Sequence, residues 1–189
     1  LSYEEQNGIK NILEQLTTTG WTPLYDDNQQ TIIALKRGKE SITLEPGGQI
    51  ELSGAPLDNI HETCEETTNH LRELKKLGNE FNFILLGMGV EPNLGLDDFP
   101  WMPKQRYGIM KKYMKKVGTL GHHMMKRTCT NQVNIDYSSE EDMVEKFRIM
   151  LNLEAIATAM FSNSPFDQGR ISKFKSLRSH FWHNTDADR

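Results

Sequence analysis

Few features of this sequence place it in a specialised class of protein. Its 189 residues include only two cysteines, Cys64 and Cys129. That is too few for a disulfide framework, so a reducing cytoplasm is the expected location. The longest apolar runs, such as residues 83–86, are too short to span a bilayer. A formal net charge of −4 gives no overall argument for binding nucleic acid or membranes.

Several diagnostic motifs are also missing. The sequence has no glycine loop of the G-x-G-x-x-G or G-x-x-x-x-G-K kind, and no H-x-x-x-H or C-x-x-C pair. These absences argue against a Rossmann or P-loop nucleotide site and against zinc. The first residues, LSYEEQNGIK, resemble neither a secretory signal nor a transit peptide. Because the chain begins without Met, we expect it to be a piece of a longer protein.

Apolar residues at helical spacing predict five helices. Gly78 is the expected stop of the second helix. The buried stripe of that helix is expected to contain Leu57, Ile60, Cys64, Leu71 and Leu74. Ser138 and Glu141 have the spacing of a capping box and predict the start of the last helix. The segment 174–182 could be helix or loop. The predicted helices cover residues 3–19, 58–78, 104–116, 119–127 and 138–160.

Alternating or short apolar segments predict five strands. With a hairpin near the front and no regular βαβ order, they favour an α+β fold, in which helices pack on one face of an antiparallel or mixed sheet. A long connection, residues 87–103, follows the fourth strand, and connections of that length are usually functional or mobile. The predicted strands cover residues 31–36, 41–45, 49–53, 82–86 and 128–137.

The segment ITLEPGGQIELSGAP, residues 42–56, predicts a hairpin that places two glutamates on one face. Side chains alternate across a strand, so Glu45 and Glu51 share a face while Ile42 and Leu44 belong to the core. With Glu51 opposite Thr43, the two carboxylates are diagonal neighbours about 5–8 Å apart. Such a pair suits a hard cation such as Mg²⁺. The alternative is a solvated outer face of the sheet.

The segment TCTNQVNIDY, residues 128–137, predicts a strand with one polar face. Gln132, Asn134 and Asp136 fall on that face, while Val133 and Ile135 fall on the other. The polar face offers oxygen acceptors and amide donors without the Lys, Glu or Arg that is usual on a plain solvent face. This pattern favours a ligand-binding surface.

A basic stretch lies between Phe99 and Ile135, where there is no Asp or Glu. Such an imbalance in an acidic chain favours an anionic ligand, and arginine is the better bidentate partner for phosphate or carboxylate. Arg106, Arg127 and Arg178 are therefore candidate ligand contacts. Lys111, Lys112, Lys115 and Lys116 more simply form the wet face of a helix.

Several segments together resemble the plant and proteobacterial type of glutamate–cysteine ligase, and the match is collinear from about Ile42 to Arg189. The segments are SITLEPGGQIELSGAPL, IHETCEETTNHL, MPKQRYGIMKKYMKKVGTLGHHMMKRTCTNQVNIDYSSE, FSNSPF and LRSHFWHNTDADR.

The resemblance implies a carboxylate–amine ligase with a glutamine synthetase-like fold, here incomplete, with residues 1–189 forming part of one catalytic domain. In that family ATP phosphorylates the side-chain carboxylate of glutamate, and the amine of cysteine displaces the phosphate. The product is γ-glutamylcysteine, the first intermediate of glutathione biosynthesis. Cations and arginines are needed because triphosphate and carboxylate repel each other.

By resemblance, Glu45 and Glu51 are ligands of Mg²⁺ or Mg-ATP, and Gln132 and Asn134 face the metal and nucleotide. Arg178 is a catalytic arginine that binds the glutamate carboxylate or the transferring phosphoryl group. Arg106 and Arg127 are further substrate contacts. Cys64 falls where plant members form a regulatory disulfide, but its expected partner is not in this sequence.

The resemblance also defines what we expect to be missing. Family members carry an upstream metal-binding strand resembling GTEHEKF and a C-terminal half that completes the nucleotide pocket, so we expect the 189-residue chain alone to be inactive. The expected partners are glutamate, cysteine and ATP, with no nucleic acid and no membrane. A plastid is the alternative location if the source is a plant.

Two other functions stay open. A relative in the same fold could join glutamate to a different amine, because the cysteine pocket cannot be identified. A non-catalytic module could bind phosphate or nucleic acid through the basic stretch. The acidic net charge and the lack of aromatic residues interleaved with the lysines count against that second function.

Overall fold

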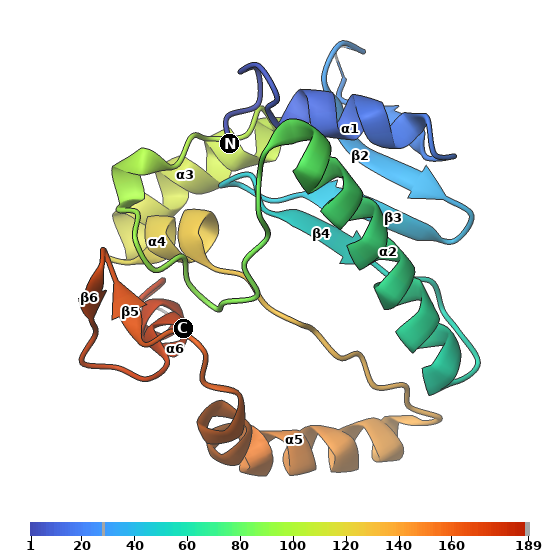
Figure 1. Ribbon diagram of the computed structural model, residues 1–189. Coiled ribbons are helices and arrows are strands. Elements are labelled where there is room, and N and C mark those ends of the chain that lie inside the picture. The colour runs from blue at the N-terminus through green and yellow to red at the C-terminus, as the bar shows by residue number, and fades with distance from the viewer. Residues whose placement is uncertain (28, 188–189) are drawn as a thin grey trace.

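The computed structural model describes residues 1–27 and 29–187 and has an α+β fold, as predicted (Figure 1). Its main sheet has four antiparallel strands in the order β1-β2-β3-β4. Three of them match the strands predicted near residues 31–53, and the first, which contains Pro23, was not predicted. The strands are β1 (Thr22–Tyr25), β2 (Ile32–Arg37), β3 (Glu40–Leu44) and β4 (Ile50–Ser53).

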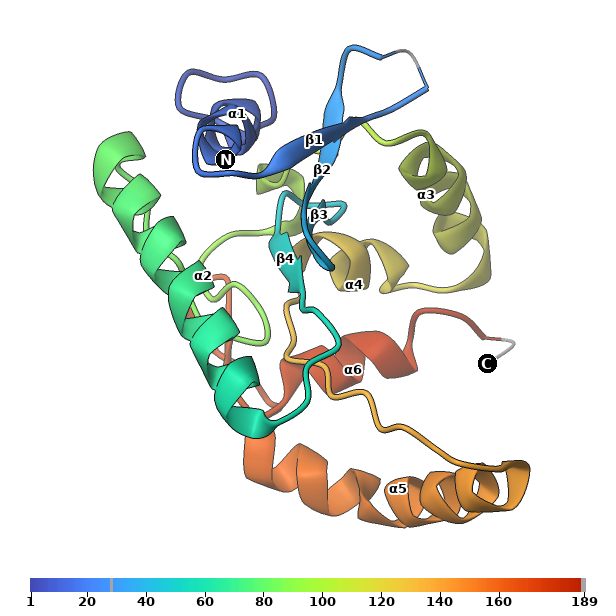
Figure 2. The same ribbon diagram turned by 90° about the vertical axis from the view of Figure 1, so that its right-hand side faces the viewer.

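Helices lie around this sheet. In Figure 2, α1 and α2 lie to one side of the sheet, whereas α3 and α4 lie to the other. A small hairpin, β5 (Phe166–Asp167) with β6 (Arg170–Ile171), lies near the C-terminus. The helices are α1 (Ile9–Thr17), α2 (Ile60–Phe81), the short 3₁₀ helix η1 (Leu96–Asp98), α3 (Gln105–Val117), α4 (Gly121–Arg127), α5 (Glu140–Phe161) and α6 (Leu177–His183).

The main core lies between α1 and the sheet. Ile12 and Leu16 of α1 are buried with Leu35 of β2 and Ile42 and Leu44 of β3. This confirms the inward face predicted for the hairpin. The helix begins at Ile9 rather than residue 3.

Helix α2 differs from its prediction at its end and in its buried stripe. It continues past Gly78 to Phe81, and Asn82 ends it in the left-handed conformation with φ 57°. Leu74 is buried as predicted, together with Leu77, whereas the predicted Leu57, Ile60, Cys64 and Leu71 are exposed. Only the C-terminal half of the helix packs on the core, so the stripe predicted along its first half is wrong.

A second, smaller cluster joins α4 to α6. Val90, Leu177 and Phe181 are buried in it. The segment 174–182, which could have been helix or loop, therefore contains a helix whose apolar side packs inward.

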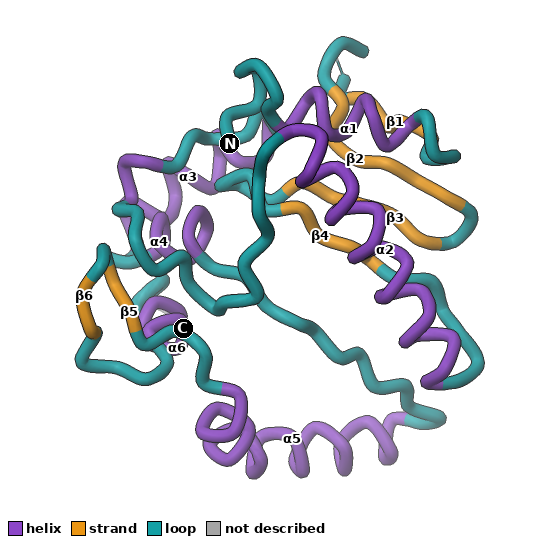
Figure 3. The backbone as a smooth tube through the Cα atoms, in the orientation of Figure 1, coloured by secondary structure: helices purple, strands orange, loops and turns teal. Residues whose placement is uncertain are grey.

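Two predicted strands are wrong. Within the described chain, residues 82–86 form no strand, and Ile84 is 82% exposed. Residues 129–137 also lie outside any strand, and Figure 3 shows them as a long extended connection between α4 and α5. Only Thr128 makes a bridge, to Val90. A strand needs neighbouring strands to bond its backbone, and these segments have none here.

Gly89 bonds both ends of the segment 129–163, which contains α5 and is called the excursion below. The carbonyl of Gly89 accepts a hydrogen bond from the N–H of Cys129 at 3.1 Å, and its own N–H donates to the carbonyl of Asn163 at 3.0 Å. Residues 129 and 163 are therefore held together at the base of this excursion.

Helix α5 begins one residue later than the predicted capping box. Its N-cap is Ser139, whose hydroxyl accepts from the N–H of Asp142 at 3.2 Å. Ser138 instead donates to the Asp142 carboxylate. Among the described residues, no helix combines the length and apolar character needed to cross a membrane.

Candidate functional site

The hairpin between β3 and β4 has the predicted register. Thr43 lies opposite Glu51, and Leu44 lies opposite Ile50. Beyond the ladder, the N–H of Glu45 donates to the carbonyl of Gln49 at 2.9 Å. Because Ile42 and Leu44 face the core, the alternation directs Glu45 and Glu51 to the opposite face.

The two carboxylates of this face have different surroundings. Glu51 is exposed, and its carboxylate accepts a hydrogen bond from Ser53 at 3.4 Å. Glu45 is half-buried, which raises the pKa of its carboxyl, and the nearby charge of Glu51 raises it further. The charges of Lys104 and Arg106 act in the opposite direction. Burial thus makes Glu45 the carboxylate with more to gain from a cation.

The start of α3 lies against the end of β3 and brings positive charge to Glu45. Arg106 approaches the Glu45 carboxylate at 3.8 Å, and its guanidinium is largely exposed. Lys104 donates to the carbonyl of Leu44 at 2.7 Å, and Tyr107 donates to the same carbonyl. Burial lowers the pKa of the Lys104 ammonium. Two cations therefore border the carboxylate pair.

Lys104 is a site residue that sequence reasoning missed. It lies in the basic stretch between Phe99 and Ile135, where the sequence pattern does not distinguish it from the other lysines. The available signal was its place just before the α3 helix, two residues from Arg106. It is half-buried, whereas Lys111, Lys112, Lys115 and Lys116 are exposed, as predicted for a wet helix face.

Arg127 lies at the end of α4, in the second cluster. Its side chain is fully buried and pairs with Asp167 at 2.7 Å. It also contacts His123 at 3.1 Å and donates to the carbonyl of Glu91 at 3.4 Å. The guanidinium lies over the Phe181 ring. These bonds join α4 to the β5–β6 hairpin and to the connection before η1.

Arg178 lies on α6, beside the start of the extended connection. It is half-buried, and its guanidinium lies 5.3 Å from the centre of the Trp182 ring. Among the described residues its Nε has no hydrogen-bond partner. Burial raises the pKa of the Cys129 thiol, and the charge of Arg178 opposes that effect. Cys129 as a residue is exposed.

Gln132 and Asn134 lie in the extended connection, where both are exposed. The Gln132 amide donates to the Asn134 side-chain oxygen at 2.9 Å. That bond confirms that the two side chains lie on one side of the backbone. The structure brings Glu45 and Arg106 into one cluster and leaves Gln132 and Asn134 outside it.

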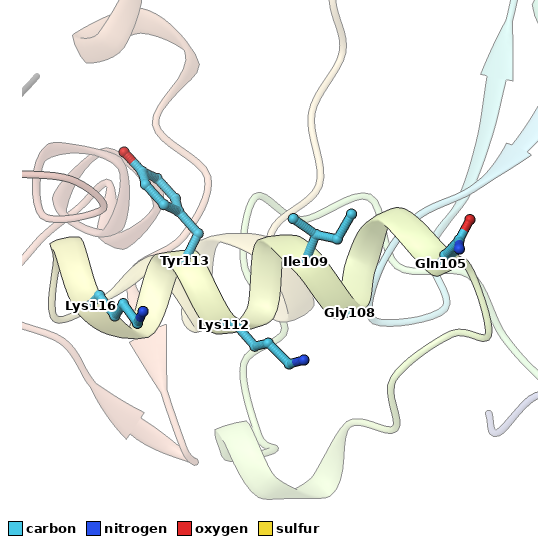
Figure 4. Close-up of a pocket in the computed structure, with 6 residues that line it drawn as sticks. All are labelled: Gln105, Gly108, Ile109, Lys112, Tyr113 and Lys116. Carbon is cyan, nitrogen blue, oxygen red and sulfur yellow. The ribbon is translucent and has the colours of Figure 1, made fainter.

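A groove in the described part of the chain is lined by none of the predicted site residues. Figure 4 shows a shallow groove along the outer side of α3, where Ile109 and Tyr113 are bordered by Lys112 and Lys116. One helix provides all of its lining, so it is a surface groove and not an enclosed substrate site. The residues described by the structure contain no group of three or more His, Cys, Asp or Glu that could hold a metal.

Comparison with known proteins identifies the family of the chain. The model of glutamate-cysteine ligase family 2 matches residues 1–189. The chain therefore belongs to that family. The match includes the first thirty residues, beyond the segment from Ile42 in which the motifs were found.

Plant enzymes are among its relatives. The chain is 52% identical over 182 residues to glutamate–cysteine ligase A, chloroplastic, of Oryza sativa subsp. japonica, covering 96% of this chain and 37% of that protein. It is 57% identical over 183 residues to glutamate–cysteine ligase, chloroplastic, of Arabidopsis thaliana, covering 97% of this chain and 34% of that protein. The chain thus spans little more than a third of the length of these relatives.

Proposed function

We propose that this chain is the metal- and glutamate-binding part of an ATP-dependent glutamate–cysteine ligase. One observation supports this most directly. In a chain of this family, the hairpin presents Glu45 and Glu51 on one face, and Arg106 and Lys104 approach the more buried of the two carboxylates. That arrangement combines oxygen ligands for a hard cation with positive charge for an anionic substrate.

The donors fit Mg²⁺ as a partial set. Glu45 and Glu51 supply carboxylate oxygens, and Mg²⁺ usually takes one or two carboxylates together with water and substrate phosphates. When bound, the ion would offset the negative charge of the triphosphate. Further ligands would come from ATP, water or other parts of the ligase.

The proposed reaction has two steps. An oxygen of the glutamate side-chain carboxylate attacks the γ-phosphorus of ATP, and ADP leaves as the acyl phosphate forms. The neutral amine of cysteine then attacks the acyl carbon, the C–O bond to phosphate breaks, and the amine proton is released. Arg106 and Arg178 are proposed to hold the anionic groups in line, which is the main protein contribution to phosphoryl transfer. Gln132 and Asn134 are proposed to face the nucleotide.

Arg127 has a different proposed role. Its guanidinium is buried and bonded to Asp167, His123 and the Glu91 carbonyl. These contacts favour a structural role for Arg127, in which its ion pair positions the end of α4. They disfavour the substrate contact that was predicted for Arg127 from the sequence.

The plant relatives are named chloroplastic, which supports a plastid location over the cytoplasm. The proposed partners are glutamate, cysteine and ATP.

The test uses the Arabidopsis ligase with its matched section replaced by this chain, called the chimera below. We expect the chimera to release ADP only when glutamate, cysteine and Mg²⁺ are all present. ADP release with another amine in place of cysteine would support the related ligase instead. An inactive chimera that is folded would contradict the proposal. The 189-residue chain alone is expected to show no turnover.

Glu51→Gln tests the metal ligands within the chimera. We expect it to raise the Mg²⁺ concentration needed for half-maximal rate by at least about tenfold, since one of two carboxylate ligands is lost. Glu65→Gln, an exposed glutamate on α2, is the matched control and should leave that concentration unchanged. The same Mg²⁺ dependence in both variants would remove Glu51 from the ligand set.

A further inference from the structure

Tyr107 lies at the centre of the contacts that join α3 to the hairpin. It is 2% exposed and belongs to the main core, so packing fixes its ring. Its hydroxyl donates to the carbonyl of Leu44 and accepts from Nη2 of Arg106 at 3.3 Å. A phenol oxygen can donate one hydrogen bond and accept others, and here it does both. One atom thus joins the residue before Glu45 to the arginine beside it.

The peptide bond between Leu44 and Glu45 is held at both of its polar groups. Its carbonyl accepts from the Lys104 ammonium at 2.7 Å as well as from Tyr107. Its N–H donates to the carbonyl of Gln49 at 2.9 Å. The Glu45 side chain therefore starts from a fixed point, and its surroundings depend on how closely a neighbouring cation approaches the carboxylate.

Arg106 stops short of a close ion pair with Glu45. Its Nη2 lies 3.8 Å from the carboxylate, whereas charge-assisted N–H···O bonds are about 2.7–2.9 Å long. The Arg127–Asp167 pair of the same chain reaches 2.7 Å. The same nitrogen of Arg106 donates instead to Tyr107. The hydroxyl thus takes the hydrogen bond that the carboxylate would otherwise attract.

We infer that Tyr107 is a positioning residue of this site. Its hydroxyl holds Arg106 away from Glu45, which leaves the carboxylate open to a cation and the guanidinium open to an anionic substrate. The Arg106 side chain is 64% exposed, so it stays accessible to such a substrate. That the two ligands are Mg²⁺ and glutamate rests on the proposed function, whereas the spacing of the two side chains does not.

Tyr107→Phe removes the hydroxyl and keeps the ring. The ring packs in the core, and its centre lies 5.0 Å from the Arg106 guanidinium carbon and 5.4 Å from the Lys104 ammonium. Phenylalanine provides the same contacts. The Leu44 carbonyl keeps its bond from Lys104, so no buried acceptor loses its last partner. Tyr113→Phe, the same change at a tyrosine of α3 that is 49% exposed, is the matched control.

Urea denaturation of the 189-residue chain tests the spacing without any ligand. Arg106→Gln, Glu45→Gln and the double variant give the coupling between the two side chains at pH 7. With Tyr107 in place we expect a small coupling, as for other exposed pairs. In the Tyr107→Phe background the guanidinium should close on the carboxylate, and the coupling should at least about double. The Tyr113→Phe background should match the native one. Equal coupling in all three backgrounds would overturn the inference.

Ligand dependence of the chimera tests the consequence of this spacing. Tyr107→Phe should raise the dissociation constant for glutamate, measured by calorimetry without ATP, by at least about fivefold, because Glu45 then occupies a donor of Arg106. The Mg²⁺ concentration needed for half-maximal rate should rise as well, and the KM for cysteine should stay unchanged. Tyr113→Phe should change none of the three. Equal effects of Tyr107→Phe on all three quantities would indicate a structural defect and would contradict the positioning role.

Glu45→Gln provides a readout that a purely structural role of Tyr107 would not move. If Tyr107→Phe weakens glutamate binding because Glu45 captures Arg106, removing the charge of Glu45 should release the guanidinium. Tyr107→Phe added to Glu45→Gln should therefore leave the glutamate dissociation constant within about twofold of that of Glu45→Gln alone. A loss of affinity as large as in the native background would contradict the inference.

The positioning role and the proposed function fail separately. A chimera that does not bind glutamate would contradict only the proposed function if the coupling in the 189-residue chain still doubles in the Tyr107→Phe background. An active chimera would contradict only the positioning role if Tyr107→Phe leaves its glutamate and Mg²⁺ dependence unchanged.

Discussion

Glu45 differs from its neighbour Glu51 because α3 packs beside it. The alternation of the hairpin predicted that both carboxylates share a face, and the register confirms it. The sequence could not show that Tyr107 and Lys104 would bond the Leu44 carbonyl next to Glu45, because those contacts join segments far apart in the chain. Local pattern predicts the face of a residue, whereas its burial depends on tertiary packing.

The raised pKa of Glu45 predicts that its carboxylate lowers the free energy of unfolding at neutral pH. A carboxyl whose pKa is higher in the folded than in the unfolded state contributes stability below its ordinary pKa of 4.5, and that contribution is lost as the pH rises through the folded value. At pH 7 and without Mg²⁺, Glu45→Gln should therefore raise the free energy of unfolding, by on the order of 1 kcal/mol. The difference should vanish near pH 4.

Urea denaturation of the 189-residue chain measures this effect. Mg²⁺ should stabilise the native sequence more than Glu45→Gln, because a ligand that binds only the folded state stabilises it. Glu65→Gln is the control and should match the native sequence at both pH values. A Glu45→Gln variant that is less stable at pH 7 would contradict the prediction.

The buried Arg127–Asp167 ion pair predicts a large loss of stability when its carboxylate is replaced by an amide. Asp167→Asn leaves the buried guanidinium without a counter-charge, which should lower the free energy of unfolding by about 3 kcal/mol. Glu4→Gln breaks the exposed pair with Lys10 and should cost less than about 0.5 kcal/mol. Chemical denaturation compares the two. If Asp167→Asn lowered the free energy of unfolding as little as Glu4→Gln, Arg127 would be well solvated without Asp167.

At the scale of elements, helix ends were predicted less well than helix positions. Gly78 was expected to end α2, yet it lies inside the helix, where a Cβ would meet the carbonyl of Phe83 at 2.7 Å. Glycine there permits close packing, and Asn82 provides the left-handed end. The sequence shows that a glycine is present. It does not show whether the fold uses its lack of a side chain for close packing or its ability to adopt the left-handed conformation that ends a helix.

Strands were predicted correctly where their partners are nearby in sequence. β2, β3 and β4 are joined by short turns, so local alternation and turn residues were enough. The segment 128–137 has equally clear alternation and forms no strand, because its partners are not supplied by neighbouring residues. The sequence therefore predicted which residues form the polar face of this segment, but it did not predict the extended, unpaired backbone that carries them.

Two glycines in different elements should respond oppositely to a methyl group. A Cβ at Gly47, in the hairpin turn, would overlap the carbonyl of Lys126, so Gly47→Ala should destabilise the protein by at least about 2 kcal/mol. Gly108 is exposed within α3 with nothing within 4 Å of a Cβ. Gly108→Ala should stabilise by about 1 kcal/mol.

Thermal and urea unfolding of both variants check this pair, with each serving as the control for the other. The loss in Gly47→Ala should come with separation of the hairpin from α4, visible as faster exchange of the Gln49 side-chain amide, which donates to the carbonyls of Met125 and Thr128. A neutral Gly47→Ala would show that the turn can move away from α4.

At the scale of the whole molecule, two clusters are connected through α4. Met125 belongs to the main core, and Arg127 packs against Phe181 of the second cluster. An ion pair ties the sheet to α2, since Arg37 of β2 bonds Glu73 at 2.8 Å. His70 is buried one turn away from Glu73 on the same helix. The division into two clusters was not predictable, because it depends on which helices meet.

The buried His70 predicts how the stability of the whole molecule depends on pH. Burial lowers its pKa below 6.5, although Glu73, Glu40 and Glu66 act in the opposite direction. The unfolded chain then binds the proton more readily, so stability is present above pH 6.5 and is lost as the pH falls through the lowered value. The slope from this proton is at most about 1.4 kcal/mol per pH unit.

His70→Leu should flatten the decline of stability between pH 6.5 and pH 5, and denaturant titrations at several pH values measure it. His61→Leu, on the exposed side of α2, should retain the native slope. Burial also lowers the pKa of His123, so part of the decline should remain. An unchanged slope in His70→Leu would contradict the assignment.

The hydrogen bonds of Gly89 have a consequence for the segment between Cys129 and Asn163. Because that glycine bonds both Cys129 and Asn163, the excursion between them leaves and returns at one point. In the 189-residue chain alone, a linker of a few residues in place of this segment could close the backbone at Gly89. Loop-closure entropy changes only slowly with length, so segments of other lengths would fit the same base. Residues 130–162 can therefore move or vary in length with little strain on the backbone that holds their two ends.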